Sequence, residues 1–243
     1  LELDSGMHRL GVTKEQLKEA ISLLQNHPHI QVVGTYTHLG DADSTVSPLT
    51  DRQRAAWSEM EPVVRASFPT ISVRHFAATK GVRFGNESGA TTARLGIGLY
   101  GLDTSPGNTL PLKPVLELRT VVSSVREVPT GENVGYNATF TAARPTKIAT
   151  LPIGYFEGVD RRLSNTGSML VHEQPAPIAG RVSMNMTSLD VTDIPNVRPG
   201  DTVIAISRDP AAINSVRSIA TQTNRIPYDV LVHVPPHLRR VVE

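Results

Sequence analysis

The chain has 243 residues, of which 39% are hydrophobic and 19% are charged, and its formal net charge is +1. A chain of this length can bury one large core or two modest ones. The near-zero net charge and the lack of a basic run argue against nucleic acid as the main partner. No apolar run approaches the ~20 residues that span a bilayer. The chain has no cysteine, which excludes disulfides and allows a reducing compartment, so we expect a cytoplasmic protein.

Residues 1–104 alternate between β-prone runs and helical periods. A helix is expected from Thr13, because Gln16 follows at capping-box spacing, and Trp57, Met60 and Val64 fall on one side of a second helix. The order strand, helix, strand, helix, strand predicts half of a (β/α)₈ barrel. The expected strands cover residues 1–3, 30–37, 71–73 and 94–99, and the expected second helix covers residues 51–66.

Residues 105–243 follow a different pattern, in which short alternating runs are separated by turns rich in proline and glycine. This pattern predicts an antiparallel β domain. A long helical period appears only at residues 210–221. The expected strands lie within residues 116–128, 147–152, 168–171, 176–178, 184–191 and 202–206.

The run from Arg94 to Gly101 reads R-L-G-I-G-L-Y-G. Its glycines lack Cβ atoms, so their backbone N–H groups can approach an anion such as a phosphate closely. An arginine, which is a donor that keeps its proton, stands directly before them. On this run alone, tight packing of a buried strand is the commoner explanation.

Eight short strings, matched in order and spacing, lie at residues 3–11, 36–38, 94–101, 135–140, 152–155, 161–163, 180–185 and 226–228. Together they resemble the alanine racemase family of fold-type III enzymes that use pyridoxal phosphate (PLP). The resemblance implies a barrel followed by a β domain, and a head-to-tail homodimer whose active site is shared between subunits. It also implies racemisation of L- and D-alanine by two bases, for peptidoglycan synthesis.

The resemblance also assigns cofactor contacts. It places Arg94 at the pyridine nitrogen of PLP, where a guanidinium leaves that nitrogen unprotonated and favours reprotonation at Cα over transamination. It places His38 beside the PLP ring, although a lone histidine after a strand is more often only a loop residue. The remaining PLP contacts that it implies are Arg9, Thr79, Gly96, Ile97 and Tyr228.

Racemisation needs a proton donor or acceptor on each face of Cα. The resemblance assigns one face to the PLP lysine and the other to Tyr136, acting from the partner subunit. A free phenol titrates near 10, so we expect positive charge from His38 and Arg94 to assist it. On the substrate side, the match gives Arg181, the backbone N–H of Met184, and the corridor residues Tyr155 and Arg161.

Several positions depart from the family pattern, among them Asn137 beside Tyr136, and Ala78–Thr79 where Asn-Ser is frequent. Glu2 stands where many members carry a lysine, often carbamylated, that holds the arginine matched by Arg9. A glutamate supplies negative charge directly, so a simpler Glu2–Arg9 pair is expected, with an exposed strand end as the alternative. Asn185 replaces a common aspartate, which removes a negative charge at the entrance and leaves a serine or broader racemase as an alternative.

None of the five lysines lies in the context of the PLP lysine, and the chain opens without methionine, as expected of a fragment. This chain alone is therefore expected to be inactive. The sequence leaves open a proteolysed enzyme, a half supplied by another polypeptide, and a non-catalytic homologue. The histidines share no ligand spacing, so no metal is expected. The lysines are Lys14, Lys18, Lys80, Lys113 and Lys147.

Overall fold

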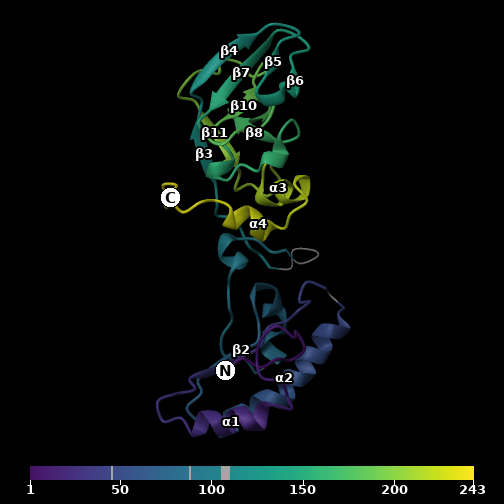
Figure 1. Ribbon diagram of the computed structural model, residues 1–243, viewed down its shortest axis with the longest axis vertical. Helices are drawn as coiled ribbons and strands as arrows, with labels where there is room; N and C mark the ends of the chain where they lie inside the picture. Colours follow the sequence, from purple (N-terminus) through teal and green to yellow (C-terminus); the bar gives the residue numbers. More distant parts are fainter. Residues whose placement is uncertain (45, 88, 105–109) are drawn as a thin grey trace. The chain divides into compact units, whose positions relative to one another are not determined.

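The computed structural model of the chain describes residues 1–44, 46–87, 89–104 and 110–243. The chain divides into two units, Leu1–Lys113 and Pro114–Glu243, which are described separately (Figure 1). Unit 1 carries the long helices and parallel pairings, whereas unit 2 carries most of the strands.

Unit 1 is built on two short parallel strands, β1 (Gly34–Tyr36) and β2 (Val73–His75), with Tyr36 opposite His75. Isolated parallel bridges continue this order, from Glu2 to Tyr36 on one side and from Ala78 to Arg94 on the other. Because all these pairings are parallel, the carboxyl ends of the segments meet at one edge. That edge carries the polar residues described below.

Two helices cover unit 1: α1 (Leu17–Gln25) and α2 (Pro48–Ser67). The predicted apolar side of α2 is confirmed, since Trp57, Met60 and Val64 are all at most 1% exposed. The helix starts three residues earlier than predicted, because Pro48 suits the first helical position and Ser47 accepts a hydrogen bond from the Thr50 N–H. The core that α2 covers also contains Leu3, Leu17, Ile21, Leu39, Phe76 and Ala77.

The predicted start of α1 at Thr13 is wrong. Thr13 and Gln16 do exchange the reciprocal capping hydrogen bonds, Thr13 N–H to Gln16 Oε1 at 3.2 Å and Gln16 N–H to Thr13 Oγ1 at 3.4 Å. These bonds close a turn, and the α-helix begins only at Leu17, the first of its buried residues.

The predicted strand at residues 94–99 is also wrong. Arg94 makes a single bridge to Ala78, and the chain then forms a 3₁₀ turn, η2 (Ile97–Tyr100). Gly96, at φ −114° and ψ −91°, leaves the extended conformation. Only Ile97 of the alternating apolar residues is buried, while Leu95 is 50% and Leu99 66% exposed.

Unit 2 contains two antiparallel sheets with strand orders β10-β7-β4 and β3-β11-β8-β9, and a small hairpin of β5 and β6. All named strand pairs in this unit are antiparallel, as predicted. An antiparallel bridge from Ile178 to Leu189 joins the sheets. The strands are β3 (Leu118–Val121), β4 (Ser124–Val128), β5 (Asn133–Val134), β6 (Phe140–Thr141), β7 (Thr146–Leu151), β8 (Ser168–Val171), β9 (Gln174–Pro177), β10 (Thr187–Asp190) and β11 (Thr202–Ile206).

Short helical segments complete unit 2. The predicted helix at 210–221 begins instead at Val216, because Ser215 caps it by accepting from the Ser218 N–H. A further short helix, α4, begins at a proline and was not predicted from the sequence. The segments of unit 2 are η3 (Tyr136–Ala138), η4 (Tyr155–Glu157), η5 (Arg161–Leu163), α3 (Val216–Gln222) and α4 (Pro227–Val232). In unit 1, the 3₁₀ helix η1 (Thr79–Glu87) precedes η2.

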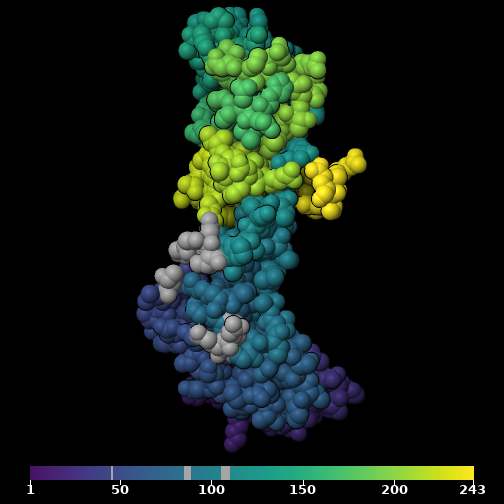
Figure 2. Space-filling view, turned by 180° about the vertical axis from the view of Figure 1, so that it is seen from behind, coloured from purple at the N-terminus to yellow at the C-terminus, as the bar shows by residue number. Residues whose placement is uncertain are grey.

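The C-terminal residues 239–243 are exposed and stand out in yellow on the space-filling view (Figure 2). Glu243 is nevertheless anchored, since the Arg119 guanidinium on β3 lies 3.0 Å from its carboxylate. Across the described ranges, no helix combines the length and apolar character needed to cross a bilayer.

Candidate active site

Arg94 is the most heavily bonded side chain at the carboxyl edge of unit 1. One terminal nitrogen donates to His75 Nδ1 (2.6 Å) and to the His75 carbonyl (3.0 Å). The other donates to the Thr37 carbonyl (2.8 Å) and to His38 Nδ1 (3.0 Å). Within the described ranges, the Nε–H has no hydrogen-bond acceptor. Four bonds thus fix the guanidinium and leave one donor directed elsewhere.

The two histidines that accept from Arg94 are held neutral. An arginine can only donate, so each Nδ1 is an acceptor and the ring proton of the neutral form sits on Nε2. Burial lowers the pKa of His38 and of His75, and the Arg94 charge lowers both further. His38 was predicted from the sequence, whereas His75 was missed. The sequence held a signal, because His75 lies two residues after the expected strand 71–73, much as His38 directly follows the expected strand 30–37.

The Tyr36 ring packs against the Arg94 guanidinium. The ring stacks on His75 with centroids 4.7 Å apart, and the Arg94 guanidinium carbon lies 5.4 Å from its centroid. The Tyr36 hydroxyl donates to a Glu2 carboxylate oxygen at 2.9 Å. That hydrogen bond, together with burial, raises the pKa of Tyr36.

The expected Glu2–Arg9 pair does not form. Glu2 accepts from Tyr36 instead, and Arg9 is exposed with no ion pair to any described residue. The shorter glutamate reaches the neighbouring strand, where an isolated bridge already places Tyr36 opposite Glu2. Glu2 therefore positions Tyr36, and through it the surface on which Arg94 rests.

Thr79 organises the glycine turn that follows Arg94. Its side chain is 3% exposed, and its hydroxyl accepts from the backbone N–H groups of Gly96 and Gly98, each at 3.2 Å. Beyond the adjoining residues, no described atom lies within 4 Å of the position that a Cβ on Gly96 would take, whereas a Cβ on Gly98 would come within 2.8 Å of Thr79 Cγ2. The turn is thus closely packed beneath Gly98 and open above Gly96, which leaves room for an anion beside the Gly96 and Ile97 backbone.

Tyr136 lies in unit 2 on a strained, exposed turn. Gly135, Asn137 and Ala138 all have positive φ, and the Tyr136 side chain is 68% exposed. A Cβ on Gly135 would lie 3.6 Å from the Arg181 backbone nitrogen, so this turn packs against the 180–182 segment. The Arg181 Nε is buried without a hydrogen-bond partner among described residues. The turn thus exposes the Tyr136 phenol, while the neighbouring segment holds a buried guanidinium Nε–H without a partner among the described residues.

A second pair of loops in unit 2 brings Tyr155 and Met184 together. The Tyr155 N–H donates to the Ser183 carbonyl (3.0 Å), and the Phe156 N–H donates to the Met184 carbonyl (2.9 Å). By contrast, the N–H groups of Met184 and Asn185 have no acceptor among the described residues. Met184 is 55% and Tyr155 44% exposed. The loop therefore offers two consecutive free backbone donors at an accessible surface.

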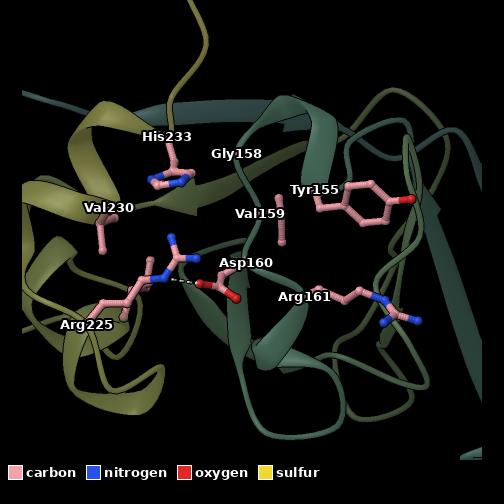
Figure 3. A pocket seen from close by; sticks show the side chains of 9 residues that line it. Tyr155, Gly158, Val159, Asp160, Arg161, Arg225, Val230 and His233 are labelled. Atoms are coloured by element: carbon pink, nitrogen blue, oxygen red, sulfur yellow. Dashed lines mark ion pairs between the residues drawn. The ribbon is translucent and has the colours of Figure 1, made fainter.

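Arg161 and Tyr155 flank a pocket of about 290 Å³ that α3 and α4 close on the other side (Figure 3). At its centre, Asp160 pairs with Arg225 at 3.1 Å. The Tyr155 phenol and the Arg161 guanidinium point away from this ion pair (Figure 3). Tyr228 lies on α4, also in unit 2, and is 38% exposed.

The structure thus groups the predicted residues into two sets. His38, Thr79, Arg94, Gly96 and Ile97 belong to one edge of unit 1, and Arg9 is exposed near its start. The unit 2 set is Tyr136, Tyr155, Arg161, Arg181, Met184 and Tyr228. In the described ranges, no three histidine or acidic side chains are arranged to hold a metal ion.

Comparison with known proteins gives matches along both units. Residues 1–104 match the family model of the alanine racemase N-terminal domain, and residues 115–242 match that of the C-terminal domain. The alanine racemase of Sorangium cellulosum is 34% identical over 99% of this chain and 64% of its own length. The chain therefore spans less than two-thirds of that relative.

Solved structures agree with these matches. The biosynthetic alanine racemase of Pseudomonas aeruginosa is 33% identical with a TM-score of 0.81, covering 99% of this chain and 65% of that one. The Bartonella henselae alanine racemase, solved with covalently bound pyridoxal phosphate, is 29% identical with a TM-score of 0.84 over the same shares. With one family model covering more than half of its residues and a second covering most of the rest, the chain belongs to the alanine racemase family.

Proposed function

We propose that the intact protein interconverts L- and D-alanine with PLP as its cofactor. The observation that carries this proposal is the fixed Arg94 guanidinium, whose Nε–H is left without an acceptor among described residues while four bonds hold its terminal nitrogens. A donor held in this way suits an aromatic ring nitrogen that must accept a hydrogen bond without being protonated. When bound, PLP supplies a ring that withdraws electrons from the Cα of the amino acid.

The residues of unit 1 fit this cofactor. The open space above Gly96 and the Gly96 and Ile97 backbone suit a phosphate, and Thr79 holds that turn in place. His38 orients Arg94 by accepting from it. By the family match, Arg9 and Tyr228 complete the cofactor contacts.

The residues of unit 2 supply the substrate side. Tyr136 serves as the base on one face of Cα, and its exposed position on a strained turn leaves the hydroxyl accessible. The free Met184 N–H binds the substrate carboxylate, and Arg181, whose backbone packs against the Gly135 turn, keeps a buried Nε–H without a partner among the described residues. Tyr155 and Arg161 line the entry corridor.

Family membership supports the rest of the proposal. Residues 1–104 form part of a PLP-binding (β/α)₈ barrel, and residues 105–243 form the β domain. The protein acts as a cytoplasmic homodimer in which Tyr136 reaches the partner's cofactor, and its product serves peptidoglycan synthesis. The second base is the PLP lysine of the family, and none of the five lysines of this chain stands in its sequence context.

The test is Tyr136→Phe in the intact protein loaded with PLP. Removing the hydroxyl removes one of the two proton-transfer groups, so we expect alanine racemisation to fall by about 10²–10⁴-fold. Circular dichroism of alanine solutions follows the reaction in both directions. The absorbance of bound PLP serves as the control that the variant still holds its cofactor.

Three results would contradict the proposal. An unchanged racemisation rate in Tyr136→Phe would remove Tyr136 from the mechanism. Faster turnover of serine than of alanine by the unmodified protein would redirect the substrate assignment. A protein that binds PLP without racemising either amino acid would instead be a non-catalytic member of the family.

A further inference from the structure

The η4 turn and the 183–186 loop are joined by more than backbone bonds. Glu157, the last residue of η4, accepts from the Gly154 N–H at 2.8 Å through Oε2 and from the Asn185 side-chain amide at 2.7 Å through Oε1. One carboxylate therefore bridges the start of its own turn and the neighbouring loop. We propose that Glu157 is a positioning residue, which works with Asn185 to hold two backbone N–H groups in the orientation that binds the substrate carboxylate.

The orientation of these N–H groups follows from peptide geometry. In a trans peptide the C=O of one residue and the N–H of the next point in opposite directions, and the described residues include no cis peptide bond. The carbonyls of Ser183 and Met184 both point at η4, where they accept from Tyr155 and Phe156. The N–H groups of Met184 and Asn185 must therefore point away from η4. Both lack acceptors among the described residues, so together they form a paired donor site for a carboxylate.

The η4 turn and the 183–186 loop are closely packed against each other. A Cβ on Gly154 would overlap the carbonyl oxygens of Ser183 and Met184, so the two backbones are in direct contact. The Ser183 N–H also donates to the Met186 carbonyl at 2.9 Å, which closes the loop. Asn185 itself is exposed, so its bond to Glu157 is the side-chain contact that fixes the outer end of the loop.

The chemistry of position 185 decides whether this contact is attractive. An amide donates to the Glu157 carboxylate, whereas an aspartate would set two carboxylates at the same short separation. Such a pair would either repel or share a proton. Asn185→Asp should therefore displace the loop and weaken carboxylate binding, with a larger effect as the pH rises.

The experiment exchanges the two groups, and it rests on the proposed function because substrate binding is its readout. Asn185→Asp and Glu157→Gln are made singly and together in the intact PLP-loaded protein. In the double variant, the side-chain amide introduced at position 157 accepts from the Gly154 N–H through its carbonyl, and its NH₂ donates to the new carboxylate at position 185. We expect the alanine KM to rise about tenfold in Asn185→Asp with little change in kcat, and to recover in the double variant.

Propionate supplies a readout that does not require catalysis. It carries the carboxylate of alanine without the amino group, so calorimetry should give the same pattern: weaker binding in Asn185→Asp, more so at high pH, and recovery in the double variant. Glu132→Gln is the matched control, because Glu132 is exposed and its side chain has no hydrogen bond or ion pair among described residues.

Each outcome decides the proposal. If Asn185→Asp leaves both KM and propionate affinity unchanged, or if the double variant is no better than Asn185→Asp, Glu157 does not position the loop. A fall in kcat alone would also overturn it.

Should the unmodified protein fail to racemise alanine, the proposed function fails, while propionate calorimetry still tests the positioning role. Should Asn185→Asp fold poorly, Asn185→Ala removes the bond without repulsion and should weaken propionate binding by a smaller factor.

Discussion

Arg94 sits between two histidines that it keeps neutral, and this arrangement makes unit 1 sensitive to acid. Burial, and then the Arg94 charge, lower the pKa of His38 and His75 in the folded state. Their unfolded pKa lies near 6.5, so the unfolded chain binds more protons below that pH. The stabilisation from the neutral rings is complete above about pH 6.5 and is lost as the pH falls toward the lowered values.

We therefore predict that the urea midpoint of unit 1 falls between about pH 7.5 and about pH 5.5. Trp57 reports on this unit, because it is the chain's single tryptophan and is 1% exposed in the unit 1 core. Other groups titrate as well, so the difference between variants carries the test. His75→Gln, which keeps an acceptor for Arg94, should flatten the pH dependence, whereas His29→Gln, at an exposed position, should not. Equal slopes in the two variants would refute this assignment.

At the level of single elements, the turn after Arg94 depends on close packing between Thr79 and Gly98. A Cβ on Gly98 would come within 2.8 Å of Thr79 Cγ2 and 3.2 Å of its Oγ1. Gly98→Ala should therefore push the Thr79 hydroxyl away from the two N–H groups that it accepts from. We expect a loss of about 1–3 kcal/mol in the free energy of unfolding, and weaker retention of PLP.

The rescue of this variant tests the cause. Serine keeps the hydroxyl of Thr79 but lacks Cγ2, so Thr79→Ser combined with Gly98→Ala should recover most of the lost stability. Trp57 fluorescence in urea measures the stability, and dialysis followed by absorbance measures the retained PLP. A double variant as unstable as Gly98→Ala would place the strain in the backbone of the turn instead.

The same turn marks the limit of prediction from sequence at this scale. Alternating Leu95, Ile97 and Leu99 satisfy the pattern of a buried strand, yet the glycines between them allow a bend that the pattern does not encode. The bounds of strands that pair on both sides were predicted more accurately. The predicted runs 168–171 and 202–206 coincide with β8 and β11. Long-range pairing there reinforces the local preference.

For the whole molecule, the sequence indicated the two-part organisation but not the partners of individual side chains. His38 and Arg94 are 56 positions apart, and their hydrogen bond depends on the parallel pairing that brings two strand ends together. Glu2 was expected to pair with Arg9, seven positions away, but the strand pairing places it opposite Tyr36 instead. Motif spacing thus predicted which residues form the candidate site, whereas the contacts between them follow from the fold.

The candidate residues fall in two units of the chain, and this leads to a test of the proposed assembly. If the intact protein is a homodimer with shared sites, Arg94→Ala damages the unit 1 half of each site and Tyr136→Phe damages the unit 2 half. Each homodimer variant should be nearly inactive. In a mixed dimer, one site combines the two damaged halves and the other combines the two intact halves.

Random reassortment of equal amounts makes half of the dimers mixed, so about a quarter of the original activity should return. The two variants are mixed, dissociated in mild denaturant, refolded with PLP and assayed for alanine racemisation. Each variant refolded alone is the control for incomplete inactivation. If no activity returns while the mixed dimer forms, Tyr136 and Arg94 act within one subunit, because a site built from a single chain would always carry one of the two defects.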